Sequence, residues 1–92
     1  MAGTRFSLGS LYITPGALEA FKTSGDDPIL YLGRHLAGDW GQLSAEDKAA
    51  NECAVKEGLR LLSAYALSNG VRVWINTEAD RSSTCILLPE EY

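Results

Sequence analysis

Basic residues are scarce in this sequence. Its 92 residues include eight lysines and arginines against twelve aspartates and glutamates, which gives a formal net charge of −4. The basic residues form no run, so the chain lacks the cationic stripe that neutralises the phosphates of duplex nucleic acid. We therefore expect no direct binding to duplex nucleic acid. A mildly acidic surface instead suits docking onto a basic partner.

Long apolar stretches are also missing, and cysteine is scarce. No segment approaches the roughly 18 consecutive apolar residues that a membrane span requires, and residues 1–10 contain no apolar run typical of a secretory leader. Cys53 and Cys85 are the two cysteines, and we expect them to be reduced, mostly buried thiols. These absences predict a cytoplasmic protein that does not enter membranes.

Several catalytic and cofactor-binding motifs are absent as well. Cysteines and the single histidine do not occur at the spacing of metal ligands. The sequence contains no phosphate-binding glycine loop that ends in Lys-Ser or Lys-Thr, and no Gly-x-Ser-x-Gly turn. We accordingly assign no metal, no cofactor and no catalytic residue, although an enzymatic activity stays open as an alternative.

The first half of the chain carries the signals of three short helices within a single domain, residues 1–92. Each helix is predicted to begin after a capping residue that is followed by proline or by acidic residues. These N-caps are Thr14, Asp27 and Ser44. The glycines expected to end the three helices are Gly25, Gly38 and Gly58.

The second half changes to the alternating pattern of β-strands. Strands are predicted over residues 59–67, 71–76 and 84–88, and Asn69-Gly70 predicts a type I′ turn between the first two. Short extended pieces are expected at residues 5–8 and 11–13. The predicted fold is therefore α+β, with about three N-terminal helices packed on a three- to four-stranded antiparallel meander.

The first candidate site is the segment 34–41, which contains Arg34, His35, Asp39 and Trp40. An imidazole, a carboxylate and an indole on one glycine-flanked loop could provide a base or a stacking surface. The alternative is a helix C-terminus, in which the histidine lies near the last carbonyls and the tryptophan folds onto the core.

Two further clusters are candidates. Asp47 and Asn51 are four residues apart and share one helix face, although they could equally cap a helix and face solvent. The turn that follows the second strand of the meander is more polar than a chain reversal requires. Its candidate residues are Thr77, Glu78, Asp80 and Arg81, which could bind a polar ligand or form an exposed turn with a weak ion pair.

The chain resembles a family of small uncharacterised proteins encoded on plasmids, phages and integrative elements. The matching blocks cover nearly the whole chain, with Cys85 as a departure. They are residues 5–9, 14–18, 34–35, 38–41, Asp47 with Asn51, Arg60, 62–65, 74–75, 77–82 and 87–92. Such proteins are labelled "plasmid-related protein" and sometimes "type I restriction endonuclease subunit M". The second label describes no activity of this chain, because a DNA methyltransferase needs a glycine-rich cofactor loop, an Asn- or Asp-Pro-Pro-aromatic motif and a far longer chain.

The resemblance implies a small accessory protein of a mobile genetic element. Its expected function is binding to a host or defence-system protein, as an anti-CRISPR-like or anti-restriction inhibitor. Tryptophan, tyrosine and arginine dominate protein interfaces, so the residues expected to bind the partner are Arg60, Arg81, Trp40, Trp74 and Tyr92. The alternative is a small ligand-binding domain or enzyme whose pocket combines residues 34–41, 47–51 and 77–81. Edge strands in a small sheet also leave homodimerisation open.

Overall fold

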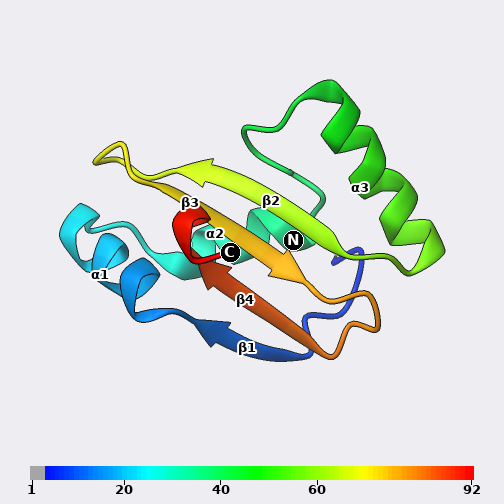
Figure 1. Ribbon diagram of the computed structural model, residues 1–92, viewed down its shortest axis with the longest axis horizontal. Helices are drawn as coiled ribbons and strands as arrows, with labels where there is room; N and C mark the ends of the chain where they lie inside the picture. Colours follow the sequence, from blue (N-terminus) through cyan, green and yellow to red (C-terminus); the bar gives the residue numbers. More distant parts are fainter. Residues whose placement is uncertain (1–3) are drawn as a thin grey trace.

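The computed structural model describes residues 4–92, and this part of the chain forms an α+β fold (Figure 1). The first three residues of segment 1–10, in which no secretory leader is predicted, lie outside the described residues. The helices are α1 (Pro15–Ser24), α2 (Pro28–Leu36), α3 (Ala45–Glu57) and the short 3-10 helix η1 (Pro89–Glu91). The strands are β1 (Ser10–Ile13), β2 (Leu61–Ala66), β3 (Arg72–Thr77) and β4 (Ser83–Leu87). From residue 4 onward, no helix combines the length and apolarity that a membrane crossing needs.

The three predicted helix starts are confirmed. Thr14, Asp27 and Ser44 are the N-caps, and each side chain accepts a hydrogen bond from a backbone N–H in the first turn of its helix. Gly25 and Gly58 end α1 and α3 in the left-handed conformation that glycine adopts at low cost. Helix α2 ends one residue earlier than expected, with Ala37 rather than Gly38 at its C-cap.

The sheet is mixed, which corrects the prediction of a purely antiparallel meander behind N-terminal helices. Its strand order is β1-β4-β3-β2, and β2, β3 and β4 form the expected antiparallel meander. Strand β1 precedes all the helices and pairs in parallel with β4, from Ser10 opposite Ser83 to Ile13 opposite Ile86. Parallel strands need a long crossover, and here nearly the whole chain lies between the two partners. Residues 5–8, which were expected to be extended, form no strand.

The turn between β2 and β3 also differs from the prediction. A type I′ turn requires a positive φ at both central residues, but of Asn69 and Gly70 only Gly70 has one, at 86°. Leu67 donates to the carbonyl of Val71, and Gly70 donates to the carbonyl of Leu67. The connection is therefore a three-residue loop that ends in a left-handed glycine. Asp26 holds its first residue by accepting hydrogen bonds from the backbone N–H and the hydroxyl of Ser68.

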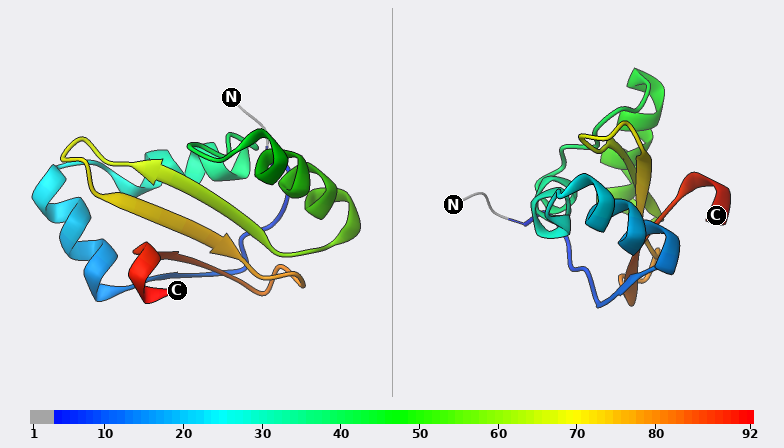
Figure 2. Two further views of the ribbon diagram at one scale, coloured as in Figure 1. Left: turned by 45° about the horizontal axis from the view of Figure 1, so that its top comes forward. Right: turned by 90° about the vertical axis from the view of Figure 1, so that its left-hand side faces the viewer.

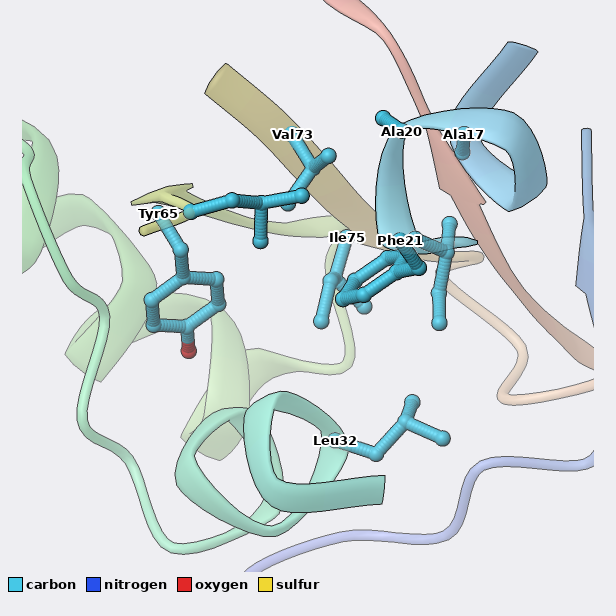
Figure 3. Close-up of a cluster of buried hydrophobic side chains, with 9 residues drawn as sticks. Ala17, Ala20, Phe21, Leu32, Tyr65, Val73 and Ile75 are labelled. Atoms are coloured by element: carbon cyan, nitrogen blue, oxygen red, sulfur yellow. The ribbon is translucent and has the colours of Figure 1, made fainter. Parts of the chain in front are cut away.

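Helices α1 and α2 cover one face of the sheet, whereas η1 lies on the other face (Figure 2). The main core forms under these two helices, and Figure 3 shows its side chains converging from the helices and from β2 and β3. Its labelled members are Ala17, Ala20, Phe21, Leu32, Tyr65, Val73 and Ile75. A smaller cluster of Trp40, Ala54 and Leu61 lies beside it, with Phe6 packed against it.

Helix α3 and the preceding loop close the β2 edge of the sheet. The side chain of Asn51 donates to the carbonyl of Leu62 at 2.8 Å and accepts from its N–H at 3.2 Å. Further along β2, Ala64 donates to the carbonyl of Trp40 and accepts from the N–H of Gln42. An exposed strand edge invites pairing with other chains, so these contacts protect β2 from such pairing.

Replacing Asn51 tests this closure. In Asn51→Ala the N–H and the carbonyl of Leu62 both lose their partner at a partly buried place, which costs about 2 kcal/mol of the free energy of unfolding. Denaturant titration of Asn51→Ala and of Lys48→Ala, an exposed position on the same helix, measures the difference. Equal unfolding midpoints for the two variants would contradict this role of Asn51.

Candidate functional site

The single histidine is at the centre of a buried chain of hydrogen bonds. His35 is fully buried, and its ring nitrogens contact the hydroxyls of Ser63 on β2 and Thr77 on β3. The hydroxyl of Thr77 lies 2.8 Å from that of Thr84 on β4, and Thr84 donates to the carbonyl of Leu8 at 2.8 Å. One imidazole thereby connects α2 to three strands and to the N-terminal segment.

The carbonyl of Leu8, at the end of this series of hydrogen bonds, fixes the direction of every hydrogen bond in the series. The carbonyl of Leu8 can only accept a hydrogen bond, so the single hydroxyl proton of Thr84 is donated to it. The Thr84 oxygen must therefore accept from the hydroxyl of Thr77. Thr77 in turn accepts from Nε2–H of His35, which leaves Nδ1 of His35 unprotonated to accept from Ser63. All polar groups of the network are satisfied while the imidazole is neutral.

The surroundings of His35 disfavour its charged form. The rings of Phe6 and Trp40 pack edge-on against the imidazole, with centroids 5.1 and 5.8 Å away. Burial, with a smaller contribution from the positive charge of Arg81, lowers the pKa of His35 to about 4. A proton on Nδ1 would also require the Ser63 hydroxyl to turn and accept instead of donate, which leaves the proton of that hydroxyl in need of another acceptor. His35 is therefore held as a neutral structural group.

The other candidates of segment 34–41 lie in two different places. Arg34 and Asp39 form an ion pair with an N–O distance of 2.7 Å at the surface, and this pair lowers the pKa of Asp39. Both line a shallow hollow of about 400 Å³ beside α2, together with Leu30 and Ala37. Trp40 faces inward with 3% of its surface exposed, so it does not present the binding surface expected from the sequence.

Asp47 and Asn51 line a second hollow, of about 180 Å³, between α3 and β2. Asp47 is exposed at the start of α3, and its N–H donates to the capping hydroxyl of Ser44. The side-chain amide of Asn51 forms hydrogen bonds with the backbone of Leu62, as described above. Leu43, Ala50 and Leu62 complete this hollow.

The residues of segment 77–81 also separate. Thr77 belongs to the buried network, whereas Glu78 contacts Arg60 and Asn76 on the other face of the sheet. Asp80 accepts a hydrogen bond from the N–H of Ser82 within the turn.

Arg81 links the same turn to the end of α3. It has a left-handed φ of 60°, and its guanidinium donates to the carbonyls of Leu59, Glu78, Ala79 and Ala54. Both terminal nitrogens of Arg81 are therefore used within the chain.

The three predicted segments do not form one pocket. His35 and Thr77 are in direct contact, but they are buried, and Arg34 with Asp39 faces a different hollow from Asp47 with Asn51. None of residues 77–81 lines either hollow. Neither of these hollows therefore combines residues of all three segments.

A group of aromatic side chains lies instead on the side of the sheet opposite α1 and α2. We call this side the open face. The strand register places Tyr12, Cys85, Asn76 and Leu62 in one row across the four strands. Trp74 lies two residues from Asn76 on the same side of β3. Tyr92, which follows η1, packs against Trp74 with ring centroids 5.4 Å apart, and Arg60 borders the face by donating to the Tyr92 hydroxyl at 3.0 Å.

Several residues important to these clusters were not identified from the sequence. Ser63 and Thr84 complete the His35 network. Ser63 is a polar residue at an inward-facing strand position, and this pattern in the sequence could have indicated a buried polar contact. Glu52 accepts from both terminal nitrogens of Arg5, at 2.7 and 2.8 Å, and from the indole of Trp40 at 2.8 Å. These hydrogen bonds lower the pKa of Glu52 to about 2. No pattern in the sequence indicated that contact.

Both cysteines are free thiols in the structure. Cys53 is exposed on α3, which corrects the expectation that both thiols are mostly buried, and Cys85 is half-buried. Within residues 4–92, no group of three or more histidine, cysteine or acidic side chains is arranged to hold a metal ion.

Comparison with known proteins finds no family model, no curated protein and no solved structure that matches this chain. Its function must therefore be inferred from the geometry of its surface.

The neutral state of His35 predicts a pH-dependent stability. The unfolded histidine titrates near 6.5 and the native one near 4, so between these values the unfolded state binds the extra proton. Stability therefore falls as the pH falls, by about 2 kcal/mol between pH 7 and pH 5. Urea unfolding of the protein and of His35→Gln at both pH values measures this loss. The variant is expected to be less stable at pH 7 but nearly constant over the interval, and a parallel decline in both proteins would contradict the assignment.

Removal of the Arg81 side chain is expected to loosen the junction between the β3–β4 turn and α3. In Arg81→Ala the left-handed backbone stays strained and the carbonyls of Ala54 and Leu59 lose a charged donor, which costs about 2 kcal/mol of unfolding free energy. Asp80→Ala, in the same turn, removes one exposed hydrogen bond and is expected to cost less than about 1 kcal/mol. The pKa of His35, followed by NMR, should also rise in Arg81→Ala, because a nearby positive charge is gone. Equal stability of the two variants and an unchanged histidine pKa would refute this role.

Proposed function

We propose that this chain acts by binding another protein through the open face of its sheet. The observation that carries the proposal is the gathering of Tyr12, Trp74 and Tyr92 on that face, with Arg60 at its border. Tyr12 and Tyr92 are 58% and 60% exposed, although burying an aromatic ring is strongly favourable. Tryptophan, tyrosine and arginine are the residue types that contribute most to protein–protein affinity.

The family resemblance supports a specific kind of partner. A small acidic protein of a mobile element is expected to meet a host or defence-system protein, and we propose that it inhibits such a protein in an anti-CRISPR-like or anti-restriction role. The acidic balance of the chain is compatible with a basic partner surface. The alternative, a ligand-binding domain or enzyme, would need residues 34–41, 47–51 and 77–81 to meet, and no observation in the structure favours it.

Affinity capture from a host lysate tests this proposal with two matched variants. The double variant Tyr12→Ser and Tyr92→Ser removes exposed aromatic area from the open face. The control, Ile29→Ser and Leu30→Ser, removes exposed apolar area from α2 on the opposite layer, where these side chains are 65% and 67% exposed. We expect one host protein to be retained by the wild type and the control and lost by the tyrosine variant. A partner that tolerates the tyrosine changes, or that is lost only in the control, would overturn the proposal.

A further inference from the structure

The border of the open face contains a cluster with the groups that recognise a positively charged side chain. Glu78 provides a carboxylate, and Asn76 donates to it from Nδ2 at 2.8 Å. The rings of Trp74 and Tyr92 meet edge to face, with an interplanar angle of 71°. Carboxylates bind guanidinium and ammonium groups through charge-assisted hydrogen bonds, and aromatic rings attract cations to their faces.

Asn76 adds an acceptor that the fold does not use. Its side chain is 8% exposed, yet Oδ1 has no hydrogen-bond partner among the described residues. Leaving a buried acceptor without a donor is unfavourable, so Oδ1 itself contributes nothing to the stability of the fold. An amide oxygen next to a carboxylate has the chemistry to accept from a second N–H of a basic side chain, which would have to displace the atoms that cover Oδ1.

Arg60 occupies this cluster through two contacts, and one of them is the hydrogen bond from Nη1 to the Tyr92 hydroxyl at 3.0 Å. Its Nη2 lies 3.4 Å from Glu78, whereas the pairs Arg5–Glu52 and Arg34–Asp39 have N–O distances of 2.7 Å. The Arg60 side chain is 55% exposed, and an exposed ion pair of this length contributes little to stability. Arg60 can therefore leave the cluster by giving up an exposed hydrogen bond to Tyr92 and a long contact with Glu78.

The charged side chains near this cluster favour the binding of a positively charged side chain. Glu90 and Glu91 lie on η1, on the same side of the sheet, and Glu90 is exposed. The other arginine of this side, Arg72, is occupied by a hydrogen bond to the carbonyl of Gln42. When Arg60 leaves, the cluster retains the carboxylate of Glu78 without a counter-charge.

We propose that Glu78, Asn76, Trp74 and Tyr92 form a binding site for a lysine or arginine side chain of a protein partner, and that Arg60 is an internal occupant which the partner's side chain replaces. This inference rests on the proposed function, because it names the chemistry by which the open face recognises its partner. The partner segment is accordingly basic rather than acidic or purely apolar.

Binding of a synthetic peptide tests the site directly. The probe is a fluorescein-labelled peptide of alternating glycine and arginine, and its matched control carries citrulline, which has nearly the same shape without the charge. Fluorescence anisotropy at fixed salt measures the affinity of each peptide for the full chain. We expect the arginine peptide to bind and the citrulline peptide to bind at least about fivefold more weakly.

Two charge-matched pairs of variants separate a specific site from general attraction to an acidic protein. Glu78→Gln is expected to weaken arginine-peptide binding about fivefold, and Glu19→Gln on α1 less than about twofold. Arg60→Ala is expected to strengthen binding several-fold, because the internal competitor is gone, whereas Lys22→Ala on α1 is not. The amide oxygen introduced by Glu78→Gln can still accept from Asn76, so this variant keeps its local fold.

Specific outcomes overturn the inference. Equal effects within either pair of variants show that only net charge matters, and equal binding of the citrulline peptide shows that no cation is recognised. If either occurs while a host protein is still lost in the tyrosine variant, the open face binds its partner by other chemistry and the proposed function stands. If no host protein depends on the open face, the proposed function fails by itself, whatever the peptide shows.

Discussion

The hydrogen-bond chain through His35 sets the position of α2 on the sheet. An imidazole with both nitrogens engaged cannot rotate or slide without leaving a buried polar group unpaired, and each such group costs about 1–3 kcal/mol. Because the chain of donors ends at the carbonyl of Leu8, the loss of any one member disturbs the others. The helix, strands β2, β3 and β4, and the N-terminal segment are therefore held in one relative arrangement by a polar contact rather than by apolar packing alone.

The closure of the β2 edge is connected to this arrangement. With α2 fixed, the chain leaves its C-terminus along β2, where the backbone of Trp40 and Gln42 pairs with Ala64. The indole of Trp40 packs edge-on against His35 and donates to Glu52, which also holds Arg5. Helix α3 follows and presents Asn51 to the remaining backbone groups of β2. Many polar residues that look functional in the sequence are used to hold this small fold together.

Local signals in the sequence predicted local structure well and long-range contacts poorly. Thr14, Asp27 and Ser44 were identifiable as N-caps because capping depends on neighbours within three residues. The parallel pairing of β1 with β4 joins residues about seventy positions apart, and a four-residue strand carries no pattern that names its partner. The turn at Asn69 was misjudged because Asp26, far away in sequence, holds Ser68 and selects a longer loop. His35 looked like a candidate base because sequence alone does not reveal Ser63 and Thr77 on either side of its ring.

Candidate residues with a structural role can be separated from candidates for binding by asking whether their polar groups already form hydrogen bonds within the chain. Both ring nitrogens of His35, both polar atoms of the Asn51 amide and both terminal nitrogens of Arg81 form hydrogen bonds within the fold, so a partner has little to offer them. The open face differs, because it combines the longest ion pair of the described residues, the unpaired oxygen of Asn76 and two tyrosines that are more than half exposed. Tyr12 and Tyr92 add little to a core that lies on the other side of the sheet. Groups that the fold leaves exposed or unpaired on one side of the sheet are the groups that a partner can satisfy, which is why we propose the open face, and not the polar loops, as the binding surface.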